Sequence, residues 1–183
     1  MRDNFYDFCK TREKGAWRKW CDENIGDFDL AVVLHLPHHQ AHLSAAVAKQ
    51  LLSHNMRIAF AMLDRHFLGT AHKRFKLRLP RFITLEHKHG VGWHAHVSLK
   101  LWRDAQGTVI DADAFKARLT QCWQQVCGQH GRYFAAFGVY VEEMRGDYLS
   151  YSLKQIGEGA GQGEVDVDNS AVDALLGQAA QRH

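Results

Sequence analysis

The chain has 183 residues, a length that favours one domain, and 46% of them are hydrophobic, enough for a sizeable core. The formal net charge of +3 is only mildly basic, so it does not by itself identify a nucleic-acid binder. No apolar run approaches the ~20 residues of a membrane span, and segment 1–9 is too polar for a secretory signal. The four cysteines form no C-x-x-C pair and are expected to be buried free thiols in a reducing compartment, which places the protein in the cytoplasm.

The first third of the chain predicts a basic N-terminal segment, a strand and a long helix. Residues 3–23 carry aromatic and apolar side chains at near-helical spacing among lysines and arginines, which predicts one or two short basic helices within a segment 1–27. These helices either pack on the domain or contact DNA phosphates, with tryptophan available for stacking. The branched run 28–36 predicts a buried strand ended by Pro37, and 38–67 predicts a helix whose first histidines are exposed.

The rest of the chain alternates strands with helices. This order favours an α+β fold, in which an antiparallel sheet of about four to five strands has split βαβ (ferredoxin- or RRM-like) topology and helices pack on the sheet. The fold alone says nothing about chemistry. The expected elements are a basic connector over 73–80, strands over 81–87 and 93–102, a helix over 111–129, a strand over 133–144, a short helix over 148–156, and a glycine-rich linker and flexible tail over 157–183.

A candidate metal site lies in the hairpin formed by the strands 81–87 and 93–102. His94 and His96 point to the face opposite the apolar residues with which they alternate. If the hairpin centres on Gly90, Glu86 lies opposite His94 and on the same face, whereas a slip of one residue would move it to the other face. Two histidines and one carboxylate leave open positions on a divalent ion, as a catalytic metal requires. The alternative is a pair of exposed histidines beside an unrelated carboxylate.

The short helix after the last strand carries a polar stripe. Tyr148, Tyr151 and Lys154 are three residues apart and share one slanting face, while Leu149 and Leu153 lie on another face that can pack on the sheet. A tyrosine and a lysine side by side favour a binding or catalytic role. The alternative is an amphipathic helix with half-buried tyrosines.

Glu86, the His94-Ala95-His96 run and the Tyr151-Ser-Leu-Lys154 run, in this order, resemble the HUH endonucleases and specifically their replication-initiator branch. The resemblance covers about 28–156, which it marks as the nuclease domain, and the 28–36 strand falls where the family has its first motif. It implies site-specific nicking and joining of single-stranded DNA by tyrosine transesterification. A covalent 5′-phosphotyrosine intermediate would form, in the initiation of rolling-circle replication of a plasmid or phage.

The resemblance also implies a role for each site residue. Glu86, His94 and His96 would hold Mg²⁺ or Mn²⁺. Tyr151 would be the nucleophile, because it keeps the family's Tyr-x-x-Lys spacing, and Lys154 would assist it. Tyr148, the second tyrosine on this helix, is either a second nucleophile or a residue for packing or DNA contact.

Expected partners are single-stranded DNA, in the form of an origin hairpin, and a host helicase and polymerase. The chain has no G-x-x-x-x-G-K loop, so unwinding would depend on a partner helicase. Four basic residues of the connector, Lys73, Arg74, Lys76 and Arg78, are expected to bind the DNA backbone. No membrane partner is expected.

Three other functions stay open. A transposase or relaxase of a mobile element would use the same chemistry, although a relaxase usually has its tyrosine near the N-terminus. A non-catalytic RRM-like module would present aromatic residues on the open sheet face. A zinc hydrolase could use two histidines and a glutamate without a nucleophilic tyrosine.

Overall fold

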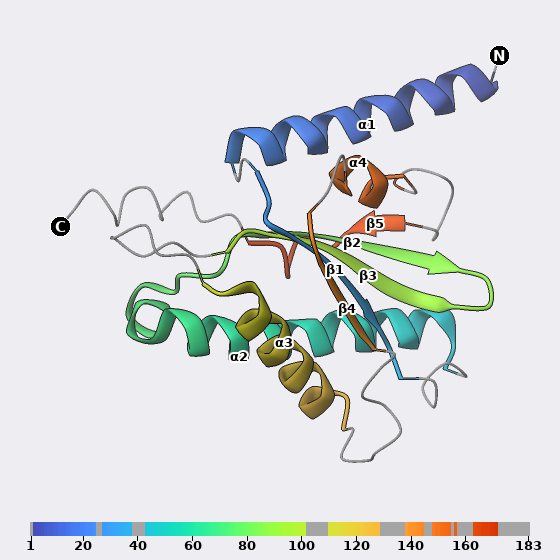
Figure 1. The fold of residues 1–183 in the computed structure, drawn as a ribbon. Helices are drawn as coiled ribbons and strands as arrows, with labels where there is room; N and C mark the ends of the chain where they lie inside the picture. Colours follow the sequence, from blue (N-terminus) through green and yellow to red (C-terminus); the bar gives the residue numbers. More distant parts are fainter. Residues whose placement is uncertain are drawn as a thin grey trace.

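A five-stranded antiparallel sheet organises the fold, with the strand order β4-β1-β3-β2-β5 (Figure 1). The α+β class and the antiparallel sheet expected from the sequence are therefore confirmed. The strands are β1 (Leu30–His35), β2 (Arg81–Lys88), β3 (Gly92–Leu99), β4 (Val139–Glu143) and β5 (Gly163–Val165). This computed structural model describes residues 2–24, 27–37, 43–101, 110–128, 138–144, 148–154, 156 and 163–171, and it describes the side chains of α1 from residue 12 onward.

Helices cover both faces of the sheet (Figure 1). The long helices α2 (Ala45–Phe75) and α3 (Ala112–Val126) lie below the sheet in Figure 1, and α1 (Arg2–Asn24) and α4 (Tyr148–Ser152) lie above it. The basic N-terminal segment thus forms one helix. None of the helices in the described ranges has the length and apolar character needed to cross a membrane.

The helix predicted over 38–67 begins and ends later than expected. Ser44 caps it, because its hydroxyl accepts a hydrogen bond from the Val47 amide at 3.4 Å. The helix continues through a non-helical Gly69 (φ 48°, ψ −117°) as far as Phe75, so the first part of the predicted basic connector is helical. Lys76, with φ 58°, ends it in the left-handed conformation.

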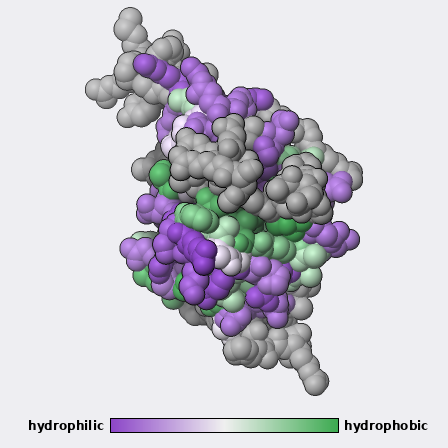
Figure 2. Space-filling view, turned by 90° about the vertical axis from the view of Figure 1, so that its left-hand side faces the viewer, coloured by the Kyte–Doolittle hydropathy of each residue, from purple (hydrophilic) through white to green (hydrophobic). Residues whose placement is uncertain are grey.

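The main hydrophobic core lies between the sheet and the two long helices. Apolar residues of β1, β2 and β3 pack there against Phe60 and Leu63 of α2 and against Phe115 and Trp123 of α3. Figure 2, which views the left-hand side of Figure 1, shows hydrophobic residues gathered in a band across the middle of the molecule, with hydrophilic residues above and below. A second, smaller cluster on the other face joins α1, α4 and β2 through Cys21, Phe82, Leu149, Leu153 and Ile156.

The flexible tail predicted over 157–183 is wrong for residues 163–171. Gly163–Val165 forms the edge strand β5 on β2, and Asp166 and Asn169 behind it are buried. Asn169 donates hydrogen bonds to the Ser53 carbonyl at 3.0 Å and to the Asp166 carboxylate at 2.8 Å, which ties this segment to α2. The segments 157–162 and 172–183 lie outside the described residues.

Three of the four cysteines, Cys21, Cys122 and Cys127, are free and buried, as expected. Cys9 lies outside the described side chains. Residues 133–137 of the strand predicted over 133–144 lie outside the described residues, as do His38, His39 and His42, and the described part of that strand is Val139–Glu143. The predicted helix over 148–156 is shorter than expected and ends at Ser152.

Candidate functional site

The β2–β3 hairpin has the register on which the candidate metal site depends. Glu86 pairs with His94 across the ladder, and Thr84 pairs with His96. Since residues two apart on a strand share a face, the carboxylate and both imidazoles lie together on the side of the sheet covered by α1 and α4. All three side chains are buried, with exposures of 4% for Glu86, 5% for His94 and 3% for His96.

The three side chains converge on one point. Glu86 Oε2 lies 2.9 Å from His96 Nε2 and 3.6 Å from His94 Nε2. One donor atom from each residue lies within 4.8 Å of the others, and this is the group of potential metal ligands found among the described residues. Ligand atoms bound to one ion at about 2.1 Å lie roughly 3.0–3.4 Å from each other. The group can therefore hold a divalent metal ion with little movement.

In both imidazoles Nδ1 has a hydrogen-bond partner of its own, and Nε2 is directed at the carboxylate. His94 Nδ1 lies 3.3 Å from the Gly92 carbonyl oxygen, and because a carbonyl only accepts, that nitrogen carries the proton. The Tyr148 hydroxyl lies 3.2 Å from the Val32 carbonyl oxygen, to which it can donate, and 3.2 Å from His96 Nδ1. The Nε2 atoms of both rings face the carboxylate, and His96 Nε2 forms a hydrogen bond with Glu86 Oε2 at 2.9 Å. With Nδ1 protonated in both rings, the two Nε2 atoms and the carboxylate would each offer a lone pair to one ion, so the donor set fits a divalent metal ion.

The protonation states also fit metal binding. Burial lowers the pKa of His94 and of His96, which keeps both imidazoles neutral near pH 7. Burial alone would raise the pKa of Glu86, but the neighbouring His94, His96 and Lys154 outweigh it and hold that pKa below its ordinary value. A carboxylate with two neutral imidazoles is the state in which these groups bind a divalent ion.

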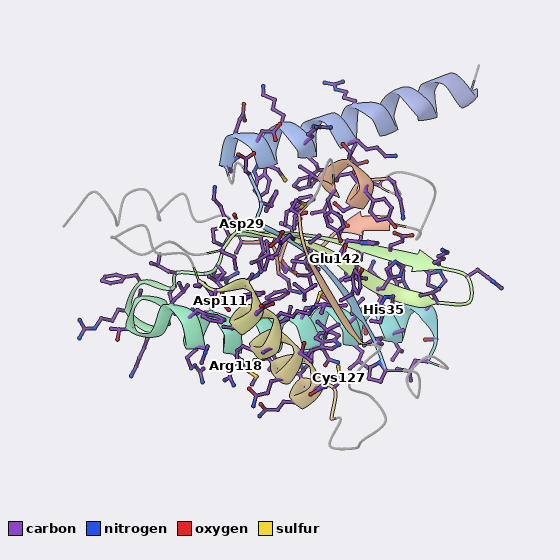
Figure 3. All side chains as sticks on the ribbon, viewed as in Figure 1. Asp29, His35, Asp111, Arg118, Cys127 and Glu142 are labelled. Carbon is purple, nitrogen blue, oxygen red and sulfur yellow. The ribbon has the colours of Figure 1, made fainter. Side chains whose placement is uncertain are left out.

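His35 is a site neighbour that the sequence did not reveal. It ends β1, where Figure 3 labels it, pairs with His94 across the ladder, and stacks its ring on the His94 ring at 5.1 Å between centroids. Burial, and then repulsion by the protonated form of His94, lower the pKa of His35. Its carbonyl accepts a hydrogen bond from Trp123 Nε1 at 3.1 Å. The sequence shows only a lone histidine at the end of an apolar strand. The pairing of β1 with β3 is what places His35 beside His94.

The tyrosine helix α4 lies directly over this group. The Tyr151 ring meets the His96 ring edge to face at 5.4 Å, and it stacks on Tyr148 at 5.9 Å. Tyr151 is 50% exposed. Tyr148 is partly buried, and burial is the main cause that raises its pKa far above the ordinary tyrosine value. The two tyrosines therefore differ: Tyr148 supports a metal-facing histidine, while Tyr151 is open to solvent.

Lys154 joins the tyrosine to the carboxylate. Its ammonium lies 3.4 Å from Glu86 Oε2 and 3.8 Å from the centre of the Tyr151 ring. Burial alone would lower the pKa of Lys154, but its hydrogen bond to Tyr151 and the charge of Glu86 raise it. Lys154 therefore stays an ammonium at neutral pH. The structure thus brings together all six residues expected to act as metal ligands or in catalysis: Glu86, His94, His96, Tyr148, Tyr151 and Lys154.

The four residues expected to bind DNA lie elsewhere. Lys73 and Arg74 are in the last turn of α2, Lys76 is its C-cap, and Arg78 is in the loop before β2. Lys73 and Lys76 border an open pocket of about 610 Å³. Helix α2 covers the sheet face opposite Glu86, and five strand residues, roughly 17 Å, separate the start of β2 from that carboxylate. The four are thus not part of the site.

Comparison of the chain with protein-family models, with curated proteins and with solved structures finds no match.

Proposed function

We propose that this protein nicks and rejoins single-stranded DNA through a covalent phosphotyrosine, with a divalent ion held by Glu86, His94 and His96. The observation that carries the proposal is the position of the exposed Tyr151 ring and the Lys154 ammonium directly over that buried group. Resemblance to the HUH replication initiators favours Mg²⁺ or Mn²⁺ as the ion and the start of rolling-circle replication as the setting.

The strand order supports the same family. β3 lies between β1 and β2 in the sheet, and the chain reaches β2 from β1 through α2. That is the order a split βαβ arrangement produces. In this arrangement the metal-binding strand is central, and the helix after β4 returns across its face, which suits a nucleophile carried on α4.

The contacts of the two tyrosines favour Tyr151 as the nucleophile. A nucleophile must reach a phosphodiester, and Tyr151 is half exposed beside the metal-binding group. Tyr148 has its hydroxyl engaged with His96 and with the Val32 carbonyl, and burial raises its pKa. We assign to Tyr148 the role of fixing the His96 ring, a supporting contact of the kind that tunes metal ligands.

The proposed reaction exchanges one ester bond for another. Tyr151 Oη bonds to phosphorus as the P–O3′ bond breaks, the phenol proton passes to solvent, and the departing 3′-oxygen takes up a proton. A divalent ion bound at the site would supply Lewis-acid polarisation of a non-bridging phosphate oxygen. The 5′-phosphotyrosine retains the bond energy, so a 3′-hydroxyl can reverse the step and rejoin the strand.

Lys154 acts in this scheme as a fixed positive charge. Only about one free tyrosine in a thousand is ionised at pH 7, so the phenolate needs stabilisation. Because the pKa of Lys154 is raised, its side chain is an ammonium at neutral pH and cannot accept a proton from Tyr151. Its role is therefore electrostatic: it stabilises negative charge on the Tyr151 oxygen and on the phosphate. Its contact with Glu86 couples that charge to the metal-binding group.

A second candidate, a non-catalytic module that binds single-stranded nucleic acid, is favoured by one observation. Tyr140 on β4 is 56% exposed and pairs with Val33 of β1, which in turn pairs with His96, so its ring is on the site face. Its hydroxyl donates to Glu142, which Figure 3 labels on the same strand. An exposed aromatic on a sheet face can stack on a base. The same ring would also suit the nuclease.

A covalent-adduct assay tests the proposal. The protein is incubated with Mn²⁺ and a pool of single-stranded DNA with a randomised centre, labelled at either the 3′ or the 5′ end, and run on a denaturing gel. We expect a protein band that carries the 3′ label and not the 5′ label, since the tyrosine keeps the 5′ phosphate. Chelation by EDTA should remove the band.

The two tyrosine variants form a matched pair. Tyr151→Phe should abolish the adduct, while Tyr148→Phe should still form it with a higher Mn²⁺ requirement. An adduct in Tyr151→Phe but not in Tyr148→Phe would show that the nucleophile is wrongly assigned, and an adduct in the double variant Tyr148→Phe/Tyr151→Phe would end the tyrosine mechanism. DNA binding without any adduct, unaffected by EDTA, would favour the non-catalytic module.

A further inference from the structure

Helix α4 is too short to hold its own position. It spans Tyr148–Ser152, and its C-terminal turn adds hydrogen bonds such as that from the Leu153 amide to the Leu149 carbonyl at 3.0 Å. Isolated helices of this length are unstable in water, because nucleation is costly and few hydrogen bonds follow it. The place of Tyr151 over the metal-binding group must therefore come from contacts with other elements.

One set of contacts is apolar. Leu149, Leu153 and the nearby Ile156 pack with Phe82 of β2 and Cys21 of α1. Two α1 tryptophans complete this cluster from the outside. Their rings lie 5.8 Å (Trp17) and 6.1 Å (Trp20) from the Phe82 ring. Helix α1 therefore lies against both α4 and the sheet, as Figure 1 also shows.

A second set of contacts is polar and runs from α1 to the backbone and side chains of α4. The Lys14 ammonium donates to the Lys154 carbonyl at 2.6 Å, and Arg18 Nη1 donates to the Ser150 hydroxyl at 2.5 Å. A cation at the carbonyl end of a helix is favourable. The carbonyl that Lys14 contacts belongs to the residue whose ammonium meets Glu86.

The two halves of the candidate site thus have different supports. The strands β2 and β3 carry Glu86, His94 and His96, whereas α4 carries Tyr151 and the turn after it carries Lys154. A loss of α1 contacts would shift α4 without changing the strand register. Displacement of a reacting group by about 1 Å can lower a rate about a hundredfold.

We infer that α1 is a positioning element for the nucleophile: Lys14, supported by Trp17 and Trp20, holds α4 so that Tyr151 and Lys154 stay over the metal-binding group. This inference rests on the proposed function. It assigns a role to a helix that composition alone suggests as a DNA-binding segment, and it separates two properties of the site. The three metal-binding side chains belong to the sheet, and the rate of DNA transfer depends on α1.

Three variants of α1 test the inference. Lys14→Met keeps the side-chain length and removes the donor, and Lys14→Arg restores a donor. Lys19→Met is the matched control, because Lys19 is exposed and its ammonium lies 3.7 Å from Glu23 of the same helix. Each is compared with the wild type for the single-turnover rate of adduct formation, for Mn²⁺ affinity by calorimetry, and for hydrogen exchange at the amides of Leu153 and Val97.

We expect Lys14→Met to lower the adduct rate tenfold or more, to lower Mn²⁺ affinity no more than Tyr148→Phe does, and to speed exchange at Leu153 but not at Val97. Lys14→Arg should recover most of the rate, and Lys19→Met should match the wild type. A double variant Trp17→Ala/Trp20→Ala should lower the adduct rate further than Lys14→Met does, again with a much smaller effect on Mn²⁺ affinity.

Wild-type rates in both Lys14→Met and the tryptophan double variant would overturn the inference. So would a loss of rate matched by an equal loss of Mn²⁺ affinity, since that indicates general unfolding. If the wild type forms no adduct, the proposed function fails, and the exchange data decide the inference alone: unchanged exchange at Leu153 in both variants would reject it.

Discussion

The two faces of strand β3 come from one stretch of alternating residues, but one face joins the hydrophobic core and the other carries the candidate metal ligands. Ala95 and Val97 point to the face covered by α2 and α3, and they belong to the main hydrophobic core. His94 and His96 point to the face covered by α1 and α4. Residues on both faces are buried. Burial therefore does not distinguish the two faces, but the chemistry of the buried groups does.

The difference lies in what each face contributes to folding. The core face packs apolar side chains from three strands against two long helices, and such burial is the main favourable term in folding. The site face buries a carboxylate and two imidazoles, which costs free energy unless they are paired or bind an ion. The core face thus supplies the stability of the fold, and this stability allows the site face to bury polar groups that can bind a metal ion.

The core face should carry the largest stability effect. Phe115 is fully buried in α3 and stacks on Phe67 at 5.5 Å. Phe115→Ala should lower the free energy of unfolding by about 3–5 kcal/mol, because it removes a large buried ring and leaves a cavity. Urea denaturation measures this, with Lys116→Ala, at an exposed position of the same helix, as control. Mn²⁺ affinity of the folded fraction should not change. A loss of metal affinity would mean that the faces are not independent.

The site face should show the reverse pattern. Glu86→Gln should reduce Mn²⁺ affinity about a hundredfold or more, roughly 2.7 kcal/mol, because it neutralises the carboxylate ligand. In EDTA its free energy of unfolding should change by less than about 1 kcal/mol, since the lost hydrogen bonds are offset by the removal of a buried charge. Calorimetry and urea denaturation give both values.

Glu164→Gln is the control for this variant, because Glu164 is a partly exposed carboxylate of β5 that pairs with Lys49. It should leave Mn²⁺ affinity unchanged. If Glu86→Gln instead unfolded the protein as severely as Phe115→Ala, the division of roles between the two faces would be wrong.

The alternation of polar and apolar residues over 81–101 predicted the β2–β3 hairpin and, through its register, the group formed by Glu86, His94 and His96. The alternation in β3 and the turn at Gly90 fix the register of two neighbouring strands, so the pairing of Glu86 with His94 follows from about twenty consecutive residues. The stripe of Tyr148, Tyr151 and Lys154 on a helix is likewise a property of local spacing.

The contributions of distant segments could not be predicted in this way. His35 joins the site only because β1 pairs with β3, a contact between residues far apart in the sequence. Strand β5 is three residues long, too short for a periodic signal, and it is defined by backbone pairing with β2. The contact of α1 with α4 depends on side chains such as Lys14 and Trp17 that also suit a DNA-binding helix. These features follow from tertiary packing, which spacing does not encode.

The apolar clusters on the two faces of the sheet should also differ in the free energy of local unfolding. Burial is the main cause that raises the pKa of Cys127, in the core cluster, and of Cys21, in the α1–α4 cluster, to about 12. At pH 8 the reactive thiolate is thus a minor species in the folded protein, and labelling must pass through an open state in which a thiol regains its ordinary pKa of about 8.5. The smaller cluster should open at lower free energy than the core.

Maleimide labelling followed by mass spectrometry measures this difference in opening free energy, which is the smallest of the expected effects. In a Cys9→Ser/Cys122→Ser background at pH 8, Cys21 should react at least tenfold faster than Cys127, a difference of about 1.4 kcal/mol in opening free energy. Both rates should rise with pH and level off near pH 9, because the open-state thiol is then ionised. A rise that continues toward pH 12 would point to reaction in the folded state. Equal rates for the two thiols would mean that α1 does not separate from α4 before the core unfolds.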